Sequence, residues 1–208
     1  MIQSNNIQFE YNDGATFNFP DIHLDSGENI LISGESGIGK TTFLHIMALL
    51  LKPKNGEFII DHENLFKLKE SRKDLYRGKN IGVIFQTPYY IRSLNLYENL
   101  LAKIYFTTSK VDSNVIDATL ERLQIDHLKN KKLYDLSEGQ KQRFSVALAT
   151  INKPKLILAD EPTSSLDLKN ANEVISLLQE ISYQSNSHLV LITHDKRLNS
   201  RFDKILEL

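Results

Sequence analysis

Alternating apolar and polar residues near the start of the chain predict a β-hairpin. Ile7 to Tyr11 and Thr16 to Phe19 alternate on either side of Asn12-Asp13-Gly14, whose residue types favour a tight turn. Short apolar runs bounded by turn residues predict six more strands. These runs are Asn29 to Ser33, Phe58 to Asp61, Ile81 to Phe85, Leu156 to Ala159, Leu189 to Thr193 and Lys204 to Leu208.

Apolar residues at three-to-four spacing predict helices between these strands. Phe43 to Leu51, the residues after Ser137 as far as Ala149, and Asn170 to Ser182 are predicted helices, and the polar stretch Glu63 to Lys79 tolerates a helix. The region from Leu94 to Tyr134 predicts two more apolar helix faces. They consist of Leu96, Leu100, Leu101 and Ile104, and of Val115, Ile116, Ala118, Leu120 and Leu123.

Strands that alternate with helices predict an α/β fold with a mostly parallel sheet and right-handed crossovers. The 208 residues fit one domain. Its predicted core comprises residues 1–86 and 137–208 and includes an N-terminal antiparallel β subdomain. Residues 87–136 are predicted to form an inserted α-helical subdomain. In such sheets, ligands bind where the parallel strands end, so we expect the site at the carboxyl ends of the strands.

A glycine-rich loop between the strand Asn29 to Ser33 and the following helix predicts a nucleotide site. Glycines let successive backbone N–H groups point at phosphate oxygens, beside the positive end of the helix. The lysine adds a charge for the β and γ phosphates, and the next hydroxyl, of Thr41, suits Mg²⁺. The predicted phosphate-binding residues are Gly34, Glu35, Ser36, Gly37, Ile38, Gly39, Lys40, Thr41 and Thr42.

Two adjacent carboxylates follow the apolar strand Leu156 to Ala159. At the end of a sheet strand, Asp160 can support the Mg²⁺ that Thr41 also contacts. Because side chains alternate along an extended chain, Glu161 points elsewhere and can polarise a water aimed at the γ phosphate. An acidic turn after a strand is ordinary by itself, but the phosphate-binding loop favours the catalytic interpretation.

Composition narrows the range of partners. The formal net charge is −1, so no nucleic-acid partner is expected, and the absence of cysteine excludes disulfides and thiolate metal sites. The longest apolar run, Phe43 to Leu51, is far shorter than the roughly 20 residues that span a bilayer. If the protein works at a membrane, we therefore expect another chain to supply the spanning part.

The segment Leu136-Ser137-Glu138-Gly139-Gln140 resembles the signature motif of the ATP-binding cassette (ABC) family. By itself, a serine beside a glycine at a helix start is an ordinary N-cap. The resemblance covers essentially the whole chain in the right order. Gln86 matches the Q-loop of the family, Ser165-Leu166-Asp167 its D-loop, His194 its switch histidine and Tyr11 its adenine-stacking aromatic residue.

The resemblance implies a P-loop ATPase that uses ATP and Mg²⁺ and works as a head-to-tail homodimer. Each ATP would lie between the phosphate-binding loop of one copy and the signature helix of the other. Ser137 and the Gly139 backbone would contact the γ phosphate across the dimer, with the D-loop residue Asp167 nearby. Glu161 would be the general base, and His194 would hold the γ phosphate and the water. Gln86 would touch Mg²⁺ or water.

Glu138 replaces the glycine that is usual in this signature. One interpretation is that the position faces away from the nucleotide and tolerates a side chain. The other is that the carboxylate repels the γ phosphate of the partner's ATP and weakens the closed dimer. We favour the first interpretation, because a helix N-terminus stabilises a nearby acidic residue.

These motifs predict the cytoplasmic ATPase subunit of a membrane transporter or of a mechanotransmitting membrane complex, peripheral on the inner face of the membrane. The segments Gln86 to Asn99 and Ala159 to Thr163 look most like the lipoprotein-releasing and macrolide-extrusion branch. The alternative is a soluble ABC ATPase that acts on nucleic acid or the ribosome. Its chromosome-type members have long coiled-coil insertions, and its ribosome-type members have two cassettes, whereas this chain has one cassette with a short insertion.

The resemblance also implies a docking groove for a coupling helix of a membrane subunit, lined by the segment after the Q-loop. That segment is rich in aromatic and apolar residues, which suit an interface. The predicted docking residues are Tyr89, Tyr90, Ile91, Leu94 and Leu96.

Overall fold

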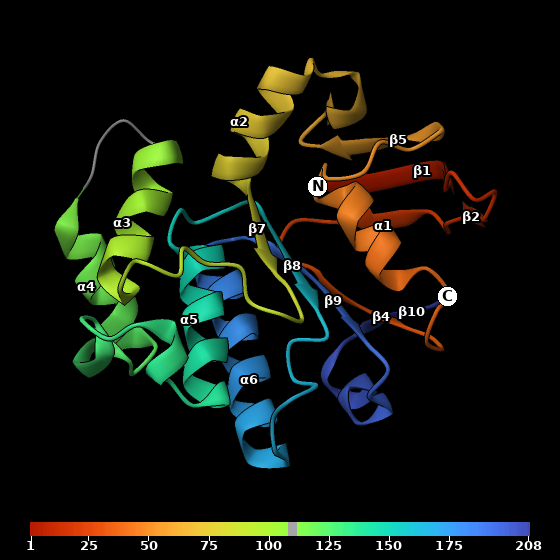
Figure 1. Ribbon diagram of the computed structural model, residues 1–208. Helices are drawn as coiled ribbons and strands as arrows, with labels where there is room; N and C mark the ends of the chain where they lie inside the picture. Colours follow the sequence, from red (N-terminus) through yellow and green to blue (C-terminus); the bar gives the residue numbers. More distant parts are fainter. Residues whose placement is uncertain (108–111) are drawn as a thin grey trace.

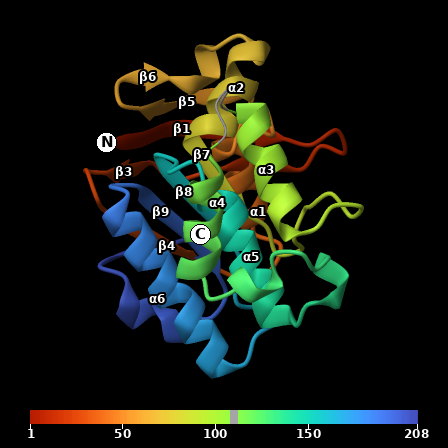
Figure 2. The same cartoon turned by 90° about the vertical axis from the view of Figure 1, so that its left-hand side faces the viewer.

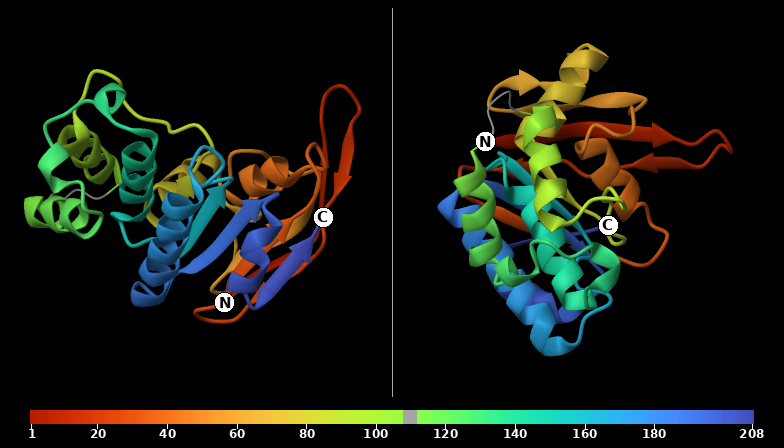
Figure 3. Two further views of the ribbon diagram at one scale, coloured as in Figure 1. Left: turned by 90° about the horizontal axis from the view of Figure 1, so that it is seen from below. Right: turned by 60° about the vertical axis from the view of Figure 1, so that its left-hand side comes forward.

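The computed structural model of the chain describes residues 1–107 and 112–208, so part of the predicted helical insertion, residues 108–111, lies outside the described residues. A parallel sheet forms the centre of the molecule. The long helices cover one face of it, and an antiparallel sheet lies on the other side (Figures 1 and 3). This architecture confirms the predicted α/β class with a separate N-terminal antiparallel part.

The parallel sheet has five strands in the order β10-β4-β9-β8-β7. Because all of them run in the same direction, the segments that follow β4, β7, β8 and β9 meet at one edge. These segments carry the phosphate-binding loop, Gln86, the acidic pair and His194, as the prediction required. The strand bounds are β4 (Asn29–Ser33), β7 (Ile81–Ile84), β8 (Leu156–Asp160), β9 (His188–Thr193) and β10 (Lys204–Glu207).

The antiparallel sheet is built around β1, which pairs with three other strands. The predicted hairpin is confirmed, with Phe9 opposite Phe17. The sequence pattern missed the first part of β1 and the whole of β3, which pair with each other from Ile2 to Ser4. The strand bounds are β1 (Ile2–Glu10), β2 (Thr16–Asn18), β3 (Ile22–Leu24), β5 (Asn55–Ile60) and β6 (Glu63–Asn64).

The predicted helices are present with shifted ends. The first begins at Lys40, inside the phosphate-binding loop, and ends at Met47 rather than near Lys52, because Leu49 adopts a left-handed φ of 57° that interrupts the helix. The α-helices are α1 (Lys40–Met47), α2 (Glu70–Asn80), α3 (Leu96–Thr107), α4 (Ser113–Arg122), α5 (Glu138–Thr150) and α6 (Leu168–Gln184). Short 3-10 helices are η1 (Leu65–Lys67), η2 (Asp126–Leu128), η3 (Leu133–Asp135) and η4 (Lys196–Arg201).

The predicted apolar face of α4 was partly wrong. Ile116 and Leu120 are fully buried, whereas Val115 and Ala118 are exposed. Helix geometry explains the difference, because positions four residues apart share a face while neighbours one or two positions away point elsewhere.

Two apolar clusters lie on opposite faces of the parallel sheet. Alternate residues of each strand point to opposite faces, so Leu31 and Ile157 pack beneath α3 to α6, while Ile32 and Leu158 pack against α1 and the antiparallel sheet. Helices α5 and α6 pack side by side over the first cluster (Figure 2). The sheet is therefore buried on both sides, and its functional side chains emerge only at its ends.

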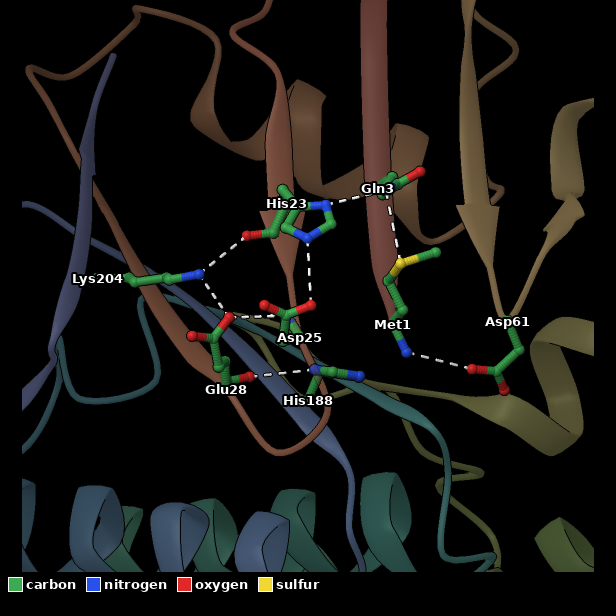
Figure 4. Close-up of polar contacts among 8 residues, drawn as sticks. All are labelled: Met1, Gln3, His23, Asp25, Glu28, Asp61, His188 and Lys204. Carbon is green, nitrogen blue, oxygen red and sulfur yellow. Dashed lines mark hydrogen bonds and ion pairs between the residues drawn. The ribbon is translucent and has the colours of Figure 1, made fainter.

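Polar contacts join the strands at the amino edge of the parallel sheet, opposite the site (Figure 4). Lys204 at the start of β10 pairs with Glu28 and donates to the His23 carbonyl at 3.2 Å. His188 at the start of β9 contacts the Glu28 carbonyl through Nδ1 at 3.2 Å, and burial lowers the pKa of its imidazole. The charges in this cluster are paired, so it stabilises the edge of the sheet and leaves no vacant site.

The described helices are all too short or too polar to cross a bilayer.

Candidate functional site

A cavity of about 410 Å³ lies at the carboxyl edge of the parallel sheet. Residues from four separate predicted motifs line it, together with two aromatic residues of the β1–β2 hairpin. The lining residues are Tyr11, Phe17, Ser36, Gly37, Gly39, Lys40, Thr41, Thr42, Gln86, Asp160, Glu161 and His194. Of the predicted loop residues, Gly34, Glu35 and Ile38 are not part of this lining.

The phosphate-binding loop is held closed by its own lysine. The Lys40 ammonium donates to the carbonyls of Gly34 at 2.9 Å and Glu35 at 2.7 Å, and the residue is 7% exposed. Gly39 has a left-handed φ of 105°, and a Cβ there would lie 2.6 Å from the Phe17 ring. Glycine is therefore required at this position, both for the backbone and for the close packing.

Tyr11 joins the hairpin to the end of the phosphate-binding loop. Its hydroxyl and Thr42 Oγ1 are hydrogen-bonded at 2.8 Å, and Phe9 and Phe17 pack edge-on against its ring. Phe17 was not predicted as a site residue. The signal that could have identified it is its register, because it lies directly opposite Phe9 in the hairpin that carries Tyr11.

Asp160, the last residue of β8, is a buried carboxylate that the described residues only partly satisfy. It is 4% exposed, and its Oδ1 has no hydrogen-bond partner among them. Burial raises the pKa of this carboxyl, a hydrogen bond from Thr41 opposes that change, and the neighbouring charge of Glu161 raises the pKa further. A free carboxylate oxygen beside a threonine hydroxyl is a donor set that fits Mg²⁺.

Glu161 lies in the cavity with both carboxylate oxygens engaged. Oε1 accepts from the His194 backbone N–H at 3.1 Å and contacts His194 Nδ1 at 2.7 Å, while Oε2 accepts from Thr193 Oγ1 at 3.2 Å. Its own N–H donates to the Ile192 carbonyl at 2.9 Å, and its φ is 48°. A left-handed backbone conformation is unusual for a glutamate, and it turns the chain at Glu161 away from the direction of β8. Thr193 was missed because a threonine that ends a strand has no distinctive sequence pattern.

The signature residues and the D-loop lie outside this cavity, beside one another. Ser137 caps α5 and forms a reciprocal pair of hydrogen bonds with Gln140. Asp167 caps α6 by accepting from the Asn170 backbone N–H at 3.0 Å and its Nδ2 at 2.6 Å. These bonds lower the pKa of the Asp167 carboxyl. Asn170 is also the residue that a Cβ at Gly139 would meet, so the D-loop cap and the signature glycine lie beside one another.

The fold does not require a glycine at position 139. A Cβ at Gly139 would meet only Asn170, at 3.6 Å from Oδ1, which is an ordinary contact. Glu138 beside it is exposed and forms an ion pair with Lys141, with 2.7 Å between Oε1 and Nζ. Packing among the described residues therefore does not explain the glycine.

Comparisons with known proteins agree with this geometry. The family profile described as "ABC transporter" matches residues 18–164. The lipoprotein-releasing system ATP-binding protein LolD of Shewanella oneidensis is 33% identical over all of this chain and 93% of its own length. LolD of Hydrogenovibrio crunogenus is also 33% identical, over the same shares of the two chains.

Solved structures show the same fold. A dimeric ATP-binding cassette in a post-hydrolysis state bound to ADP and Pi superposes with a TM-score of 0.90 at 29% identity, over all of this chain and 94% of that one. With the profile match and the full-length relatives, this likeness shows that the chain belongs to the ABC transporter family and is an ABC ATPase cassette.

Proposed function

We propose that the protein is the ATP-binding and ATP-hydrolysing subunit of a membrane transporter or mechanotransmitting membrane complex, and that ATP drives its head-to-tail homodimerisation at the cytoplasmic face. One observation carries this proposal. The cavity contains only half of the expected site, while Gly139, which the fold does not require, lies on a separate surface. A second copy would supply the missing half.

Binding of the nucleotide follows from the cavity lining. Lys40 and the backbone of residues 34–42 would hold the phosphates, and the ring of Tyr11 would contact the adenine. Thr41 and Asp160 would hold Mg²⁺, with Gln86 beside them. The ion, when bound, neutralises charge on the β and γ phosphates. Asp160 then gains a partner for the oxygen that the described residues leave unpaired.

Glu161 is the proposed general base, and His194 controls it. In this structure His194 Nδ1 occupies the Glu161 oxygen that would otherwise accept a proton from water. When the His194 ring turns to the γ phosphate, that oxygen keeps only its bond from the His194 backbone N–H and can accept a further proton. The water can then attack phosphorus while its proton passes to Glu161, and ADP leaves.

The dimer surface would include Ser137, Gly139 and Asp167. Asn170 is hydrogen-bonded to Asp167 and lies beside Gly139, so the signature helix and the D-loop would meet the partner's phosphate-binding loop on one surface. Because Gly139 has no side chain, its backbone N–H can approach the partner's γ phosphate closely.

The names of the relatives favour the lipoprotein-releasing branch over the macrolide-extrusion branch. A membrane subunit would then dock on the segment after Gln86. The structure changes the set of docking residues. Leu96 is 0% exposed and belongs to the core, so its assignment to the docking surface was wrong, and Tyr90 is packed against the same core. Tyr89 and Ile91, at 74% and 46% exposed, remain proposed docking residues, together with the half-buried Leu94.

Substitution of the proposed base tests this function. Glu161→Gln should retain ATP binding and lower the rate of hydrolysis by about 10²–10⁴-fold, because the amide cannot accept the proton. With hydrolysis blocked, ATP and Mg²⁺ should convert the variant from monomer to dimer in size-exclusion measurements.

A matched control is Glu173→Gln, which alters an exposed glutamate that pairs with Arg143 outside the cavity. It should hydrolyse ATP as the unmodified protein does. If Glu161→Gln hydrolyses ATP at the normal rate, or stays monomeric with ATP, the proposed mechanism is wrong.

A further inference from the structure

An acidic side chain lies between the two signature residues that the proposed dimer would bring to the partner's nucleotide. Glu138 is the first residue of α5, with the N-cap Ser137 before it and Gly139 after it. Its side chain is 59% exposed. The proposed function therefore places a negative charge beside the contacts to the γ phosphate of the partner's ATP.

A lysine of the same helix holds this carboxylate. The Lys141 ammonium donates to Glu138 Oε1 at 2.7 Å. The two residues are three positions apart, so their side chains share one face of α5. The Lys141 side chain is 24% exposed, so the lysine is the more enclosed member of the pair and the carboxylate is the member that is open to solvent.

The place of Lys141 in the helix is unfavourable without this pair. The Lys141 backbone N–H donates to the Ser137 carbonyl at 2.9 Å, so the residue belongs to the first turn of α5. The N-terminal end of a helix carries a partial positive charge, which disfavours a lysine there and favours a glutamate. The helix dipole therefore does not explain the lysine, whereas the pairing with Glu138 does.

The charges around the Glu138–Lys141 pair have partners of their own. Arg143, the next cation along α5, pairs with Glu173 at 2.7 Å. The Asp167 carboxylate, on the same surface, has the hydrogen bonds of its helix cap. Within residues 1–107 and 112–208, Glu138 forms no second ion pair. Lys141 is therefore the residue that offsets its charge.

We propose that Lys141 neutralises Glu138 so that the signature helix can approach the γ phosphate of the partner's ATP, which makes Lys141 a positioning residue of the closed dimer. This inference rests on the proposed function and goes beyond it, because neither Glu138 nor Lys141 lines the nucleotide cavity. An unpaired carboxylate beside Gly139 would repel the negatively charged phosphate oxygens. Paired with Lys141, the carboxylate adds no net charge to that surface.

The two members of the pair should not contribute equally to the dimer. Glu138 is joined directly to Ser137 and Gly139, whereas Lys141 lies almost one turn further along α5. Without Glu138, the long Lys141 side chain can extend its ammonium into water. Without Lys141, the Glu138 carboxylate stays beside the residues that would meet the phosphate. Removal of the lysine should therefore have the larger effect.

A double-mutant cycle in the Glu161→Gln protein tests the inference, because slow hydrolysis keeps ATP in place. Sedimentation velocity with Mg²⁺-ATP gives the dissociation constant of the dimer. Lys141→Met should raise this constant at least about tenfold, since each closed dimer contains two such pairs and each faces a phosphate. Adding Glu138→Gln should return the constant to within about threefold of the starting protein, because the two changes are coupled. Glu138→Gln alone should change it by less than about threefold.

Further measurements separate charge from folding. Lys141→Arg keeps the positive charge and should retain the dimer. Lys129→Met breaks an exposed ion pair with Asp117, between α4 and the segment after η2, and should leave the dissociation constant unchanged. The effect of Lys141→Met should shrink between about 0.05 M and about 0.5 M salt, because salt screens exposed charges. ATP binding by the Lys141→Met monomer should be normal, since Lys141 lies outside the nucleotide cavity.

Contrary results have definite meanings. A Lys141→Met protein that dimerises as tightly as the starting protein would refute the inference, and so would a weakened dimer that Glu138→Gln does not restore. A loss of equal size at low and high salt would also refute it, because repulsion by an exposed charge depends on screening. All three results leave the proposed function intact. If the Glu161→Gln protein itself stays monomeric with Mg²⁺-ATP, the proposed function fails and this inference fails with it.

Discussion

The nucleotide cavity and a second hollow each contain a buried or half-buried charge that the described residues leave without a full set of partners. The second hollow lies between α2 and α3, is lined by Leu50, Tyr89, Lys103 and Phe106 among others, and is called the α2–α3 groove here. In the cavity it is the Asp160 carboxylate, whose pKa is raised by burial. In the groove it is the Lys103 ammonium, whose pKa is lowered by burial. Lys40 differs from both, because two backbone carbonyls satisfy its ammonium.

The comparison separates a charge that groups of the chain satisfy from two charges that lack a full set of partners among the described residues. A charge that is proposed to bind a ligand can be held by the chain itself until the ligand arrives, as the Lys40 ammonium is held by two backbone carbonyls of the phosphate-binding loop. Asp160 and Lys103 are not held in this way by the described residues, and the desolvation of an incompletely paired charge lowers the stability of the free protein. The two charges are of opposite sign, so the Asp160 carboxylate suits a cation and the Lys103 ammonium suits an anionic group.

The largest expected effect is at Asp160. Asp160→Asn should reduce the rate of ATP hydrolysis at least about a hundredfold, because the side chain that is proposed to hold Mg²⁺ loses its negative charge. The nucleotide-free variant should nevertheless be more stable, by about 1 kcal/mol, since a desolvated charge is removed. Rates with Mg²⁺-ATP and thermal unfolding without nucleotide measure the two effects.

The pH dependence sharpens this test. The folded protein keeps the Asp160 proton at pH values where the unfolded chain, with a pKa near 3.8, has lost it. Deprotonation of Asp160 therefore costs the folded wild type more free energy than it costs the unfolded chain. The stability of the wild type falls as the pH rises above 3.8, whereas the stability of the variant, which has no carboxyl there, does not change for this reason. The stability difference should grow with pH across that range, and a constant difference would show that the charge of Asp160 is not its cause.

A smaller effect is expected at Lys103 in the isolated subunit. Lys103→Met keeps an apolar stem and removes the charge, so the free energy of unfolding should rise by under about 1 kcal/mol, with ATP hydrolysis unchanged. Denaturant unfolding measures the first and a phosphate-release assay the second. A clear loss of stability would mean that the Lys103 ammonium has a structural partner and is not comparable with Asp160.

The smallest effect is expected at Glu138, an exposed charge that already has a partner. Its ion pair with Lys141 is at the surface, where such pairs contribute roughly 0–1 kcal/mol. Glu138→Gly should change ATP hydrolysis by less than about threefold. A large gain in ATP-driven dimerisation, measured by size exclusion, would instead support repulsion between Glu138 and the partner's nucleotide.

Most of the fold was predictable because its strands are continuous apolar runs between clear turn residues. The parallel strands β4, β7, β8 and β9 were all located within one residue at each end. Local patterns failed where pairing with distant segments decides the structure. Strand β3 has three residues and exists through its pairing with β1, and α1 ends where Leu49 leaves the helical conformation.

The candidate site also has a part that the sequence predicted and a part that depends on contacts between distant segments. The phosphate-binding loop and the acidic pair were predictable, because their chemistry depends on fixed spacing within one segment. The contacts of Glu161 with Thr193 and His194 join residues more than thirty positions apart, and no local pattern predicts them. The division into core residues 1–86 and 137–208 and helical residues 87–136 stays a prediction.

By itself, the sequence determined the α/β class, the strand order along the chain and the residues that can bind a nucleotide, because each depends on composition or spacing over a short stretch. The tertiary structure decided which of those residues share a cavity, that Ser137 and Gly139 lie outside it, and that Leu96 is core rather than surface. Within residues 1–107 and 112–208, it also left the Lys103 ammonium without a partner, beside Arg77. Burial and pairing depend on which distant segments meet, and only the packed chain brings them together.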